Sequence, residues 1–316
     1  MSIQWVGVDV SKDWFDAYVG GREQRFSNTP QGFVSLRVWL GEGDFQVIVE
    51  ATGGHERALR RFLDEVQIPA SVANAAQVYA FGRALGKLHK TDKVDARLLA
   101  EFGKMRLPAP SGLDQEHRQE LRRLVAAWKS LQAQLLAVAS QLRSPEMPDV
   151  AKKGLEAAHT GLDIAMLDVM SGIEHLIASH PDLSEDLKLL ISIVGVAKVS
   201  AVQILAQLPE GELRSARQLA AYSGTAPGIR ESGSSVRGAS RVPRACNRRF
   251  RSVLYMCALV ARRFCPHLRA FGDRLAARGK AKKQVIVAVM RKLAHAIHAV
   301  LTTRTPYNGE KLCPNT

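Results

Sequence analysis

Four acidic residues share a pattern that fits metal-dependent chemistry: Asp9, Glu50, Asp92 and Asp95. The first two each end an apolar, strand-like run of sequence, and the last two lie three residues apart, on one face if that segment is helical. Carboxylates that converge from two strand ends and a helix provide hard oxygen ligands. Such ligands suit Mg²⁺, which assists phosphoryl transfer on nucleic acids.

Each acid also has an ordinary interpretation when it is considered alone. Asp9 fits a turn after a strand, and Glu50 fits a cap for a helix that begins near Gly54. Asp92 and Asp95 fit the positive N-terminal end of a helix. The metal hypothesis depends on the coincidence that all four occupy the positions that a single nuclease-like fold brings together.

A second candidate lies far along the chain, at Ser232 in a Gly- and Ser-rich segment, residues 222–238, which we expect to be a loop. Serine beside glycine is common in loops, so its chemistry alone is a weak signal. The arginines around it favour a role, because guanidinium groups stabilise a phosphate under attack. The cations that we expect to contact nucleic acid are Lys12, Arg230, Arg237, Arg241, Arg244, Arg248 and Arg249.

The first third of the chain predicts a mixed α/β domain that would position the acids. Hydrophobic patterning predicts five strands, at 3–10, 14–19, 22–27, 45–50 and 68–73. It predicts helices at 30–40, 55–66, 75–85 and 92–106. Three strands with short connections, followed by alternating strands and helices, resemble the order of ribonuclease-H-like (RuvC-like) domains, which carry metal-binding acids at these places.

A Pro- and Gly-containing linker at 107–113 separates this domain from helices. Apolar residues spaced by three and four over 121–142 form a heptad stripe, and a second amphipathic helix is expected at about 150–179. This pattern fits either an intramolecular helical hairpin or a dimerising coiled coil. We predict a helical coiled-coil middle segment, and one stripe does not reveal which chain supplies its partner.

The last third is mainly helical. Two apolar stretches flank a turn at Gly195, which fits either a phosphate-binding helix–hairpin–helix or an ordinary packing unit. Further helices are expected at 247–263 and 281–301.

Charge is distributed very unevenly. The whole chain carries a formal net charge of +14, of which residues 191–316 contribute +17, residues 1–110 contribute +1 and residues 111–190 contribute −4. A strongly cationic final third predicts a polyanionic partner, and nucleic acid fits better than a membrane surface because no basic helix lies beside an apolar anchor.

Other classes of protein are disfavoured by the sequence. Its four cysteines show no paired spacing, which argues against a zinc site or a disulfide framework. No P-loop or dinucleotide motif appears, so a nucleotide-driven or hydride-transfer enzyme is unsupported. We find no signal peptide and no apolar run of membrane-spanning length, so we expect a cytoplasmic protein without membrane partners.

Several ordered motifs resemble the DEDD transposases of bacterial insertion sequences (the insertion sequence 110/116/902 family), whose relatives include the Piv-type DNA invertases. The N-terminal motifs are Gly7-Val8-Asp9-Val10, Val49-Glu50-Ala51-Thr52-Gly53-Gly54 and Thr91-Asp92-Lys93-Val94-Asp95. The C-terminal motifs are Ile193-Val194-Gly195-Val196, Ala221-Tyr222-Ser223-Gly224-Thr225 and Arg230-Glu231-Ser232-Gly233. The chain departs from the family pattern at Cys246, where a glycine usually precedes the asparagine.

The resemblance implies a RuvC-like domain whose acids, here Asp9, Glu50, Asp92 and Asp95, bind Mg²⁺. It also implies a nucleophilic serine, which maps to Ser232 with Ser234 and Ser235 as rivals. Family members are similar in using a bridge RNA, encoded by the element, that pairs with donor and target DNA. Recombination of two duplexes implies a homo-oligomer, either a dimer or a tetramer.

The resulting hypothesis is a bacterial or archaeal recombinase that acts at the nucleoid and exchanges DNA strands through a serine–DNA link. We assign residues 1–108 to the catalytic α/β domain, 109–185 to the helical middle segment and 186–316 to a basic, mainly α domain with the serine. Two alternatives remain at this point. One is a RuvC-like hydrolytic nuclease such as a junction resolvase, and the other is a non-catalytic nucleic-acid-binding protein.

Overall fold

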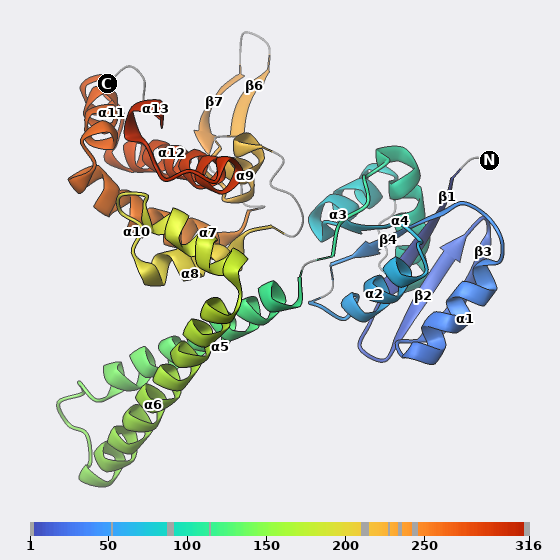
Figure 1. Ribbon diagram of the computed structural model, residues 1–316, viewed down its shortest axis with the longest axis horizontal. Coiled ribbons are helices and arrows are strands. Elements are labelled where there is room, and N and C mark those ends of the chain that lie inside the picture. The colour runs from blue at the N-terminus through green and yellow to red at the C-terminus, as the bar shows by residue number, and fades with distance from the viewer. Residues whose placement is uncertain are drawn as a thin grey trace. The chain divides into compact units, whose positions relative to one another are not determined.

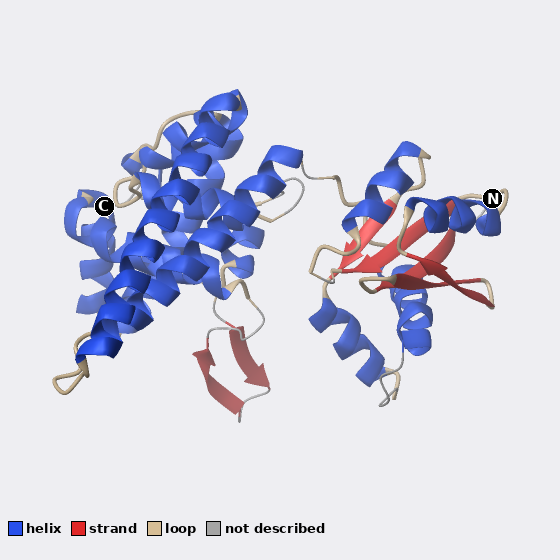
Figure 2. Ribbon diagram, turned by 90° about the horizontal axis from the view of Figure 1, so that it is seen from below, coloured by secondary structure: helices blue, strands red, loops and turns tan. Residues whose placement is uncertain are grey.

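The computed structural model describes residues 3–51, 53–86, 92–113, 115–209, 215–226, 228–232, 236–241 and 246–312. Of residues 92–95, 228–232 and 236–241 it describes only the backbone. The chain divides into two compact units, Met1–Leu113 (unit 1) and Asp114–Thr316 (unit 2). Unit 1 is built around a β-sheet and unit 2 is mainly helical, as the coloured ribbons show (Figure 2).

Unit 1 contains one mixed sheet of five strands with the order β3-β2-β1-β4-β5 (Figure 1). The strands are β1 (Gln4–Val10), β2 (Trp14–Val19), β3 (Arg22–Ser27), β4 (Phe45–Glu50) and β5 (Ala70–Ala73). The first three strands pair antiparallel, whereas β1 with β4 and β4 with β5 pair parallel. This is the ribonuclease-H-like order expected from the sequence. Strand β5 begins two residues late, because the amide of Ile68 donates to the carbonyl of Leu63 and Pro69 has no amide hydrogen.

Helices cover both faces of this sheet. Helices α1 (Pro30–Leu40) and α2 (Arg57–Glu65) pack on the face that carries Val6 and Val8. Helices α3 (Ala75–Ala84) and α4 (Asp92–Arg106) pack on the face that carries Ile48. Because side chains alternate along a strand, every second residue of β1 and β4 faces α4.

Hydrogen bonds hold the segment after α4 against the rest of unit 1. The guanidinium of Arg60, which is 3% exposed, donates to the carbonyls of Ser111 and Gly112 at 3.2 and 2.9 Å. The hydroxyl of Ser71 lies 3.1 Å from the carbonyl oxygens of both Pro108 and Ala109, and the Gln46 side-chain amide donates to Pro108 at 2.8 Å. The predicted linker at 107–113 therefore lacks helix and strand but is held by hydrogen bonds.

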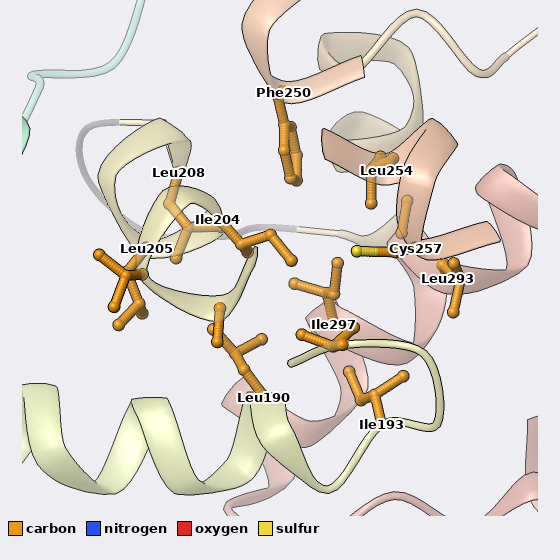
Figure 3. Packing of buried hydrophobic residues seen from close by; sticks show 14 of the residues in the cluster. Leu190, Ile193, Ile204, Leu205, Leu208, Phe250, Leu254, Cys257, Leu293 and Ile297 are labelled. Atoms are coloured by element: carbon orange, nitrogen blue, oxygen red, sulfur yellow. The ribbon is translucent and has the colours of Figure 1, made fainter. Parts of the chain in front are cut away.

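Unit 2 is a helical domain with one small sheet. Its helices are α5 (Glu116–Gln141), α6 (Asp149–Ser179), α7 (Pro181–Ile191), α8 (Lys198–Gln207), α9 (Ala216–Tyr222), α10 (Arg248–Phe264), α11 (Pro266–Ala277), α12 (Lys282–Thr303) and α13 (Gly309–Leu312). The core lies where α7, α8, α10 and α12 meet, with Leu190, Ile204, Phe250 and Ile297 directed into it (Figure 3). Helices α9, α11 and α13 were not predicted, although Ser215 caps α9 and Pro266 begins α11.

The heptad stripe belongs to α5, which pairs with α6 of the same chain. The stripe begins inside the core of unit 2, where Leu121 and Trp128 are buried, and farther along the helix Leu135 is half-buried. This arrangement is the intramolecular hairpin, and no coiled coil is evident in the described residues. The expectation of a coiled-coil segment was wrong because one partner helix within the chain already covers the stripe.

The turn at Gly195 packs against α10. Gly195 has a φ of 97°, and a Cβ added there would lie 2.7 Å from the carbonyl oxygen of Cys257 and 2.8 Å from the amide of Ala261. Such close approach of two backbones requires glycine. The geometry corresponds to the packing unit, which was one of the two interpretations left open by the sequence.

Helix α12 has the length and hydropathy of a membrane span, contrary to our expectation that no segment does. Its apolar residues are those of a core helix, however, since Val289, Leu293 and Ile297 are fully buried among the other helices of unit 2. The sequence-based search missed it because Arg291 and Lys292 interrupt the apolar run.

His295 on α12 is expected to make the stability of unit 2 depend on pH. Burial lowers the pKa of His295, and the charges of Arg291, Lys292, His298 and Arg217 lower it further. A histidine with a lowered pKa stabilises the fold in its neutral form, so the full stability is present above about pH 6.5 and declines as the pH falls below it. We therefore expect the melting temperature to fall between about pH 7.5 and about pH 5.5, and His295→Gln to reduce this fall.

Circular dichroism melts of the full-length protein test this expectation. The control is His175→Gln, which changes an exposed histidine on α6 of the same unit. An unchanged pH dependence in His295→Gln, or an equal change in His175→Gln, would show that other groups control the decline.

Candidate active site

Asp9 and Glu50 lie at the ends of adjacent strands on the same face of the sheet. The parallel pairing of β1 and β4 aligns Val8 with Val49, so the next residue of each strand lies side by side. Because side chains alternate along a strand, Asp9 lies on the same face of the sheet as Gly7. Glu50 lies on the same face as Ile48, which packs under α4. Both acids are half-buried. The sequence pattern thus placed these two carboxylates correctly at neighbouring strand ends.

Helix α4 crosses this face at an unusually short distance from β1. A Cβ added at Gly7 would overlap the carbonyl oxygen of Ala96 and lie 2.5 Å from the amide of Ala100. A Cβ added at Gly103 would overlap the indole ring of Trp5. Since Gly103 lies over Trp5 and Ala96 lies over Gly7, α4 runs antiparallel to β1.

The same register carries the first turn of α4 toward Asp9. Asp9 lies two residues beyond Gly7, or about 6.6 Å along the strand, and that distance equals about four residues of helix rise. Gly7 contacts α4 at Ala96 and Ala100. The turn that contains Asp92 and Asp95 begins four residues before Ala96. The backbone therefore brings the four predicted positions to one end of one sheet face. The side chains of Asp92 and Asp95 lie outside the described part of the structure.

Asp16 is an additional acid at this end of the sheet, and the sequence reasoning missed it. The antiparallel register places Asp16 of β2 directly opposite Asp9. Its carboxylate is nearly buried and accepts two hydrogen bonds from Arg25, from Nε at 2.9 Å and Nη2 at 2.7 Å. Directly opposed carboxylates repel each other, and the guanidinium of Arg25 compensates the charge of Asp16. The short connection between the two strands was the signal that could have revealed this pairing.

The loops after the two acid-bearing strands are joined by Asn28. Its side-chain amide donates to the carbonyl of Ser11 at 3.0 Å and to the carbonyl of His55 at 3.2 Å. In the second loop, Gly53 and Gly54 adopt φ values of 73° and 106°, which glycine adopts without strain. Lys12 is exposed in the first loop. These contacts fix the strand ends and leave a cation beside them.

The donor set fits a divalent cation, because carboxylate oxygens are the ligands that hard divalent ions prefer. Among the side chains that the structure describes, no group of three or more His, Cys, Asp or Glu residues is close enough to hold a metal ion. The side chains of Asp92 and Asp95 are not among those described, so the four-acid site stays a prediction.

In unit 2 the Gly- and Ser-rich segment forms a hairpin, which corrects our expectation of a loop. Strands β6 (Gly228–Ser232) and β7 (Val236–Arg241) pair antiparallel, with Ser232 opposite Val236. The β-branched residues Ile229 in β6 and Val236 in β7 favour extended structure despite the glycines. Ser232 is the last residue of β6, and its rivals Ser234 and Ser235 lie outside the described residues.

The predicted arginines occupy several elements of this region. Arg230 lies in β6, and Arg237 and Arg241 lie in β7. Arg248 and Arg249 are exposed in the first turn of α10, and Arg244 lies outside the described residues.

Both ends of the hairpin segment are anchored. The amide of Asn247 donates to the carbonyl of Tyr222 at 2.8 Å, and its side chain caps α10 by accepting from Phe250 at 2.9 Å. At Cys246, where the sequence departs from the family pattern, Sγ accepts a hydrogen bond from Arg251 at 3.3 Å. The thiol also packs closely on Gly224, where an added Cβ would lie 2.6 Å from Sγ.

Comparison with known proteins matches both units to transposases. Residues 6–145 match the IS110-type DEDD transposase domain, and residues 187–273 match the Transposase IS116/IS110/IS902 family. The pilin gene-inverting proteins of Moraxella lacunata and Moraxella bovis are each 29% identical over 320 residues, covering 98% of both chains. An uncharacterized 43.6 kDa protein of insertion element IS110 from Streptomyces coelicolor is 29% identical over 162 residues, which cover 51% of this chain and 39% of that protein.

Proposed function

Since this chain belongs to the IS116/IS110/IS902 family of transposases, which are phosphoryl-transfer enzymes, we propose that it exchanges DNA strands through a covalent serine–DNA intermediate. The observation that supports the metal-dependent part of the proposal is the close antiparallel packing of α4 on β1, beside the parallel pairing of β1 with β4. The family implies DNA as a partner and a divalent metal as a cofactor, and we propose that the metal is Mg²⁺.

The four acids form the metal-dependent half of the proposed mechanism. Asp9, Glu50, Asp92 and Asp95 would hold the ion, which supplies charge stabilisation for the attacking and leaving oxygens of a phosphodiester. Arg25 supports this half by neutralising Asp16, so that the acid opposite Asp9 adds no net negative charge. Asn28 keeps the two strand ends together.

Ser232 forms the nucleophilic half. Its hydroxyl oxygen forms a bond to phosphorus while the bond between phosphorus and the sugar oxygen breaks, and the hydroxyl proton leaves with the departing sugar oxygen. The reverse reaction, with the hydroxyl of another strand as attacker, rejoins DNA without an external energy source. Arg230, Arg237, Arg241, Arg244 and Arg248 would neutralise the phosphates around this step.

We further propose that the enzyme works as a dimer or tetramer, guided by a bridge RNA, in the cytoplasm of a bacterium or archaeon. Two duplexes must be held for exchange, and the Moraxella relatives are named for inverting a gene, which needs exchange at two sites. The hairpin of α5 and α6 leaves Leu136, Ile164 and Leu167 between 56% and 70% exposed, which suits packing against a second copy. The net charge of +17 beyond residue 190 suits both RNA and DNA.

The proposal is tested by trapping the covalent intermediate. The protein is incubated with Mg²⁺, the RNA that flanks its gene and a nicked suicide DNA, and the products are separated on a denaturing gel. We expect a protein–DNA adduct that is absent in Ser232→Ala.

The rival serines supply the matched controls. Ser234→Ala and Ser235→Ala remove the same hydroxyl group from the same segment, and both should retain the adduct. DNA cleavage at the unmodified rate by Ser232→Ala, or DNA cleavage with no adduct in any form, would instead support a hydrolytic nuclease.

A further inference from the structure

A cleft in unit 2 has the charge of an anion-binding site and lies outside both proposed catalytic centres. It is formed where α5, α8 and α10 meet and has a volume of about 440 Å³. Its polar lining consists of Lys129, Ser130, Gln203, Gln207, Arg249 and Ser252. We call it the α5–α8–α10 cleft.

The cleft carries positive charge without a compensating acid. Its lining includes two cations and no Asp or Glu. Neither Lys129 nor Arg249 pairs with a carboxylate among the residues that the structure describes, and Lys129 donates to the neutral side chain of Gln132 at 3.0 Å. Lys129 is exposed overall, and partial burial lowers the pKa of its ammonium group.

The remaining lining matches a phosphate with an attached sugar. The hydroxyls of Ser130 and Ser252 and the side-chain amides of Gln203 and Gln207 can donate hydrogen bonds to phosphate and sugar oxygens. Val125 and Val253 add an apolar surface that suits the sugar carbons. A guanidinium beside an ammonium gives one bidentate and one point-charge contact to phosphate oxygens.

The cleft is connected to the segment that carries Ser232. The side-chain oxygen of Gln207 accepts a hydrogen bond from Asn247 at 3.2 Å, and the same Asn247 amide donates to the hydroxyl of Tyr222 at 2.9 Å. Tyr222 and Asn247 are the residues at which the hairpin segment leaves and re-enters the helical core. A strand fixed in the cleft is therefore fixed relative to the base of the hairpin.

We propose that the α5–α8–α10 cleft binds the phosphodiester backbone of a nucleic acid strand, away from the bond that reacts, and thereby positions that strand. This inference rests on the proposed function, because it assumes a nucleic acid substrate. The shared ligand chemistry is the phosphodiester, which either DNA or the guide RNA can supply.

The test compares two double variants that remove the same charge. Lys129→Gln/Arg249→Gln changes the cleft, and Lys152→Gln/Arg278→Gln changes exposed cations on α6 and after α11. Binding of a labelled DNA duplex and of a labelled RNA hairpin is measured by fluorescence anisotropy over a range of salt, with EDTA present so that no reaction occurs.

For the cleft variant we expect binding weaker by about tenfold or more, and a salt dependence whose log–log slope is smaller by about 1.4–1.8, as two lost phosphate contacts require. The control variant should keep the slope of the unmodified protein. If the cleft variant binds only the DNA duplex more weakly, the cleft binds DNA. If it binds only the RNA hairpin more weakly, the cleft binds the guide. Weaker binding of both probes indicates that the cleft contacts the backbone that they share.

Two results would overturn the inference, and they differ in what they say about the proposed function. If the unmodified protein binds nucleic acid and the cleft variant binds as the control variant does, the cleft is not a binding site and the recombinase proposal stands. If the unmodified protein binds neither probe, both proposals fail. Ser252→Glu is a second variant, which places a carboxylate in the cleft and should weaken binding at least as much as the double variant.

Discussion

Replacing Asp9 with asparagine is expected to lower the rate of DNA strand exchange by roughly 10²- to 10⁴-fold and to leave the fold intact. Asparagine keeps the volume of the side chain but removes the negative charge that holds a divalent cation. The loss of several kcal/mol of transition-state stabilisation corresponds to that change in rate. Exchange between two DNA sites is measured with purified protein, Mg²⁺ and the flanking RNA.

The melting temperature separates a catalytic role of Asp9 from a structural one. Asp9 lies opposite Asp16, whose charge Arg25 compensates, and beside Glu50. Because asparagine keeps the volume of the side chain, we expect Asp9→Asn to melt close to the temperature of the unmodified protein, whereas loss of a structural carboxylate would lower that temperature.

The matched control is Asp13→Asn, which makes the same substitution at an exposed position in the turn after β1. Its exchange rate should stay within about twofold of the unmodified rate, as for most surface substitutions. Unchanged exchange in Asp9→Asn would remove the metal site from the mechanism. Equal losses in both variants would point to the overall charge of unit 1.

The second large effect is expected from Gly7→Ala, which adds one methyl group where α4 approaches β1. The methyl would overlap the backbone of Ala96 and lie 2.5 Å from the amide of Ala100, and a helix backbone cannot rotate out of the way as a side chain can. Overpacking of this kind costs about 1–3 kcal/mol, or roughly 4–20 °C in the melting temperature of a domain of this size. Displacement of α4 also moves the turn of Asp92 and Asp95, and a shift of about 1 Å lowers catalysis by about 10²-fold.

Tryptophan fluorescence follows this variant, because Trp5, Trp14 and Trp39 of the four tryptophans lie in unit 1. Gly112→Ala is the matched control, since a Cβ at Gly112 meets nothing within 4 Å and the backbone there is not left-handed. It should retain both the melting temperature and the exchange rate. A Gly7→Ala protein with normal stability and normal exchange would show that the close approach of α4 has no part in forming the site.

Most of the sheet and its helices could be predicted from the sequence because local patterns specify them. Strand β4 is mostly apolar, with three consecutive β-branched residues, and α1 begins where Thr29 caps a helix with Pro30 in its first turn. The hairpin of β6 and β7 was missed because its glycines and serines have low strand propensity and its pairing is made between segments. Helix α9 was missed because seven residues are too few to show a period.

For the candidate site, the sequence identified residue types but not their relative positions. The ends of β1 and β4 could be anticipated because parallel strands end at the same edge of a sheet. The opposition of Asp9 and Asp16 depends on the register of β1 with β2, and the position of α4 depends on the missing side chains of Gly7 and Gly103. Tertiary contacts determine both the opposition of the two acids and the position of α4, so neither can be predicted from the linear pattern of residues. The α5–α8–α10 cleft likewise combines three helices that are far apart in sequence.

The hydrogen bonds that hold residues 108–112 against α2, β4 and β5 also limit where the sheet of unit 1 can be joined to the second unit of a relative. A junction placed directly after α4 would deprive Arg60 of two carbonyl acceptors and the buried Gln46 and Ser71 of theirs. A chimera joined after Gly112 keeps these acceptors in the same piece as their donors. The sheet and residues 108–112 therefore belong in one piece, and we expect a chimera to fold when its junction falls beyond Gly112.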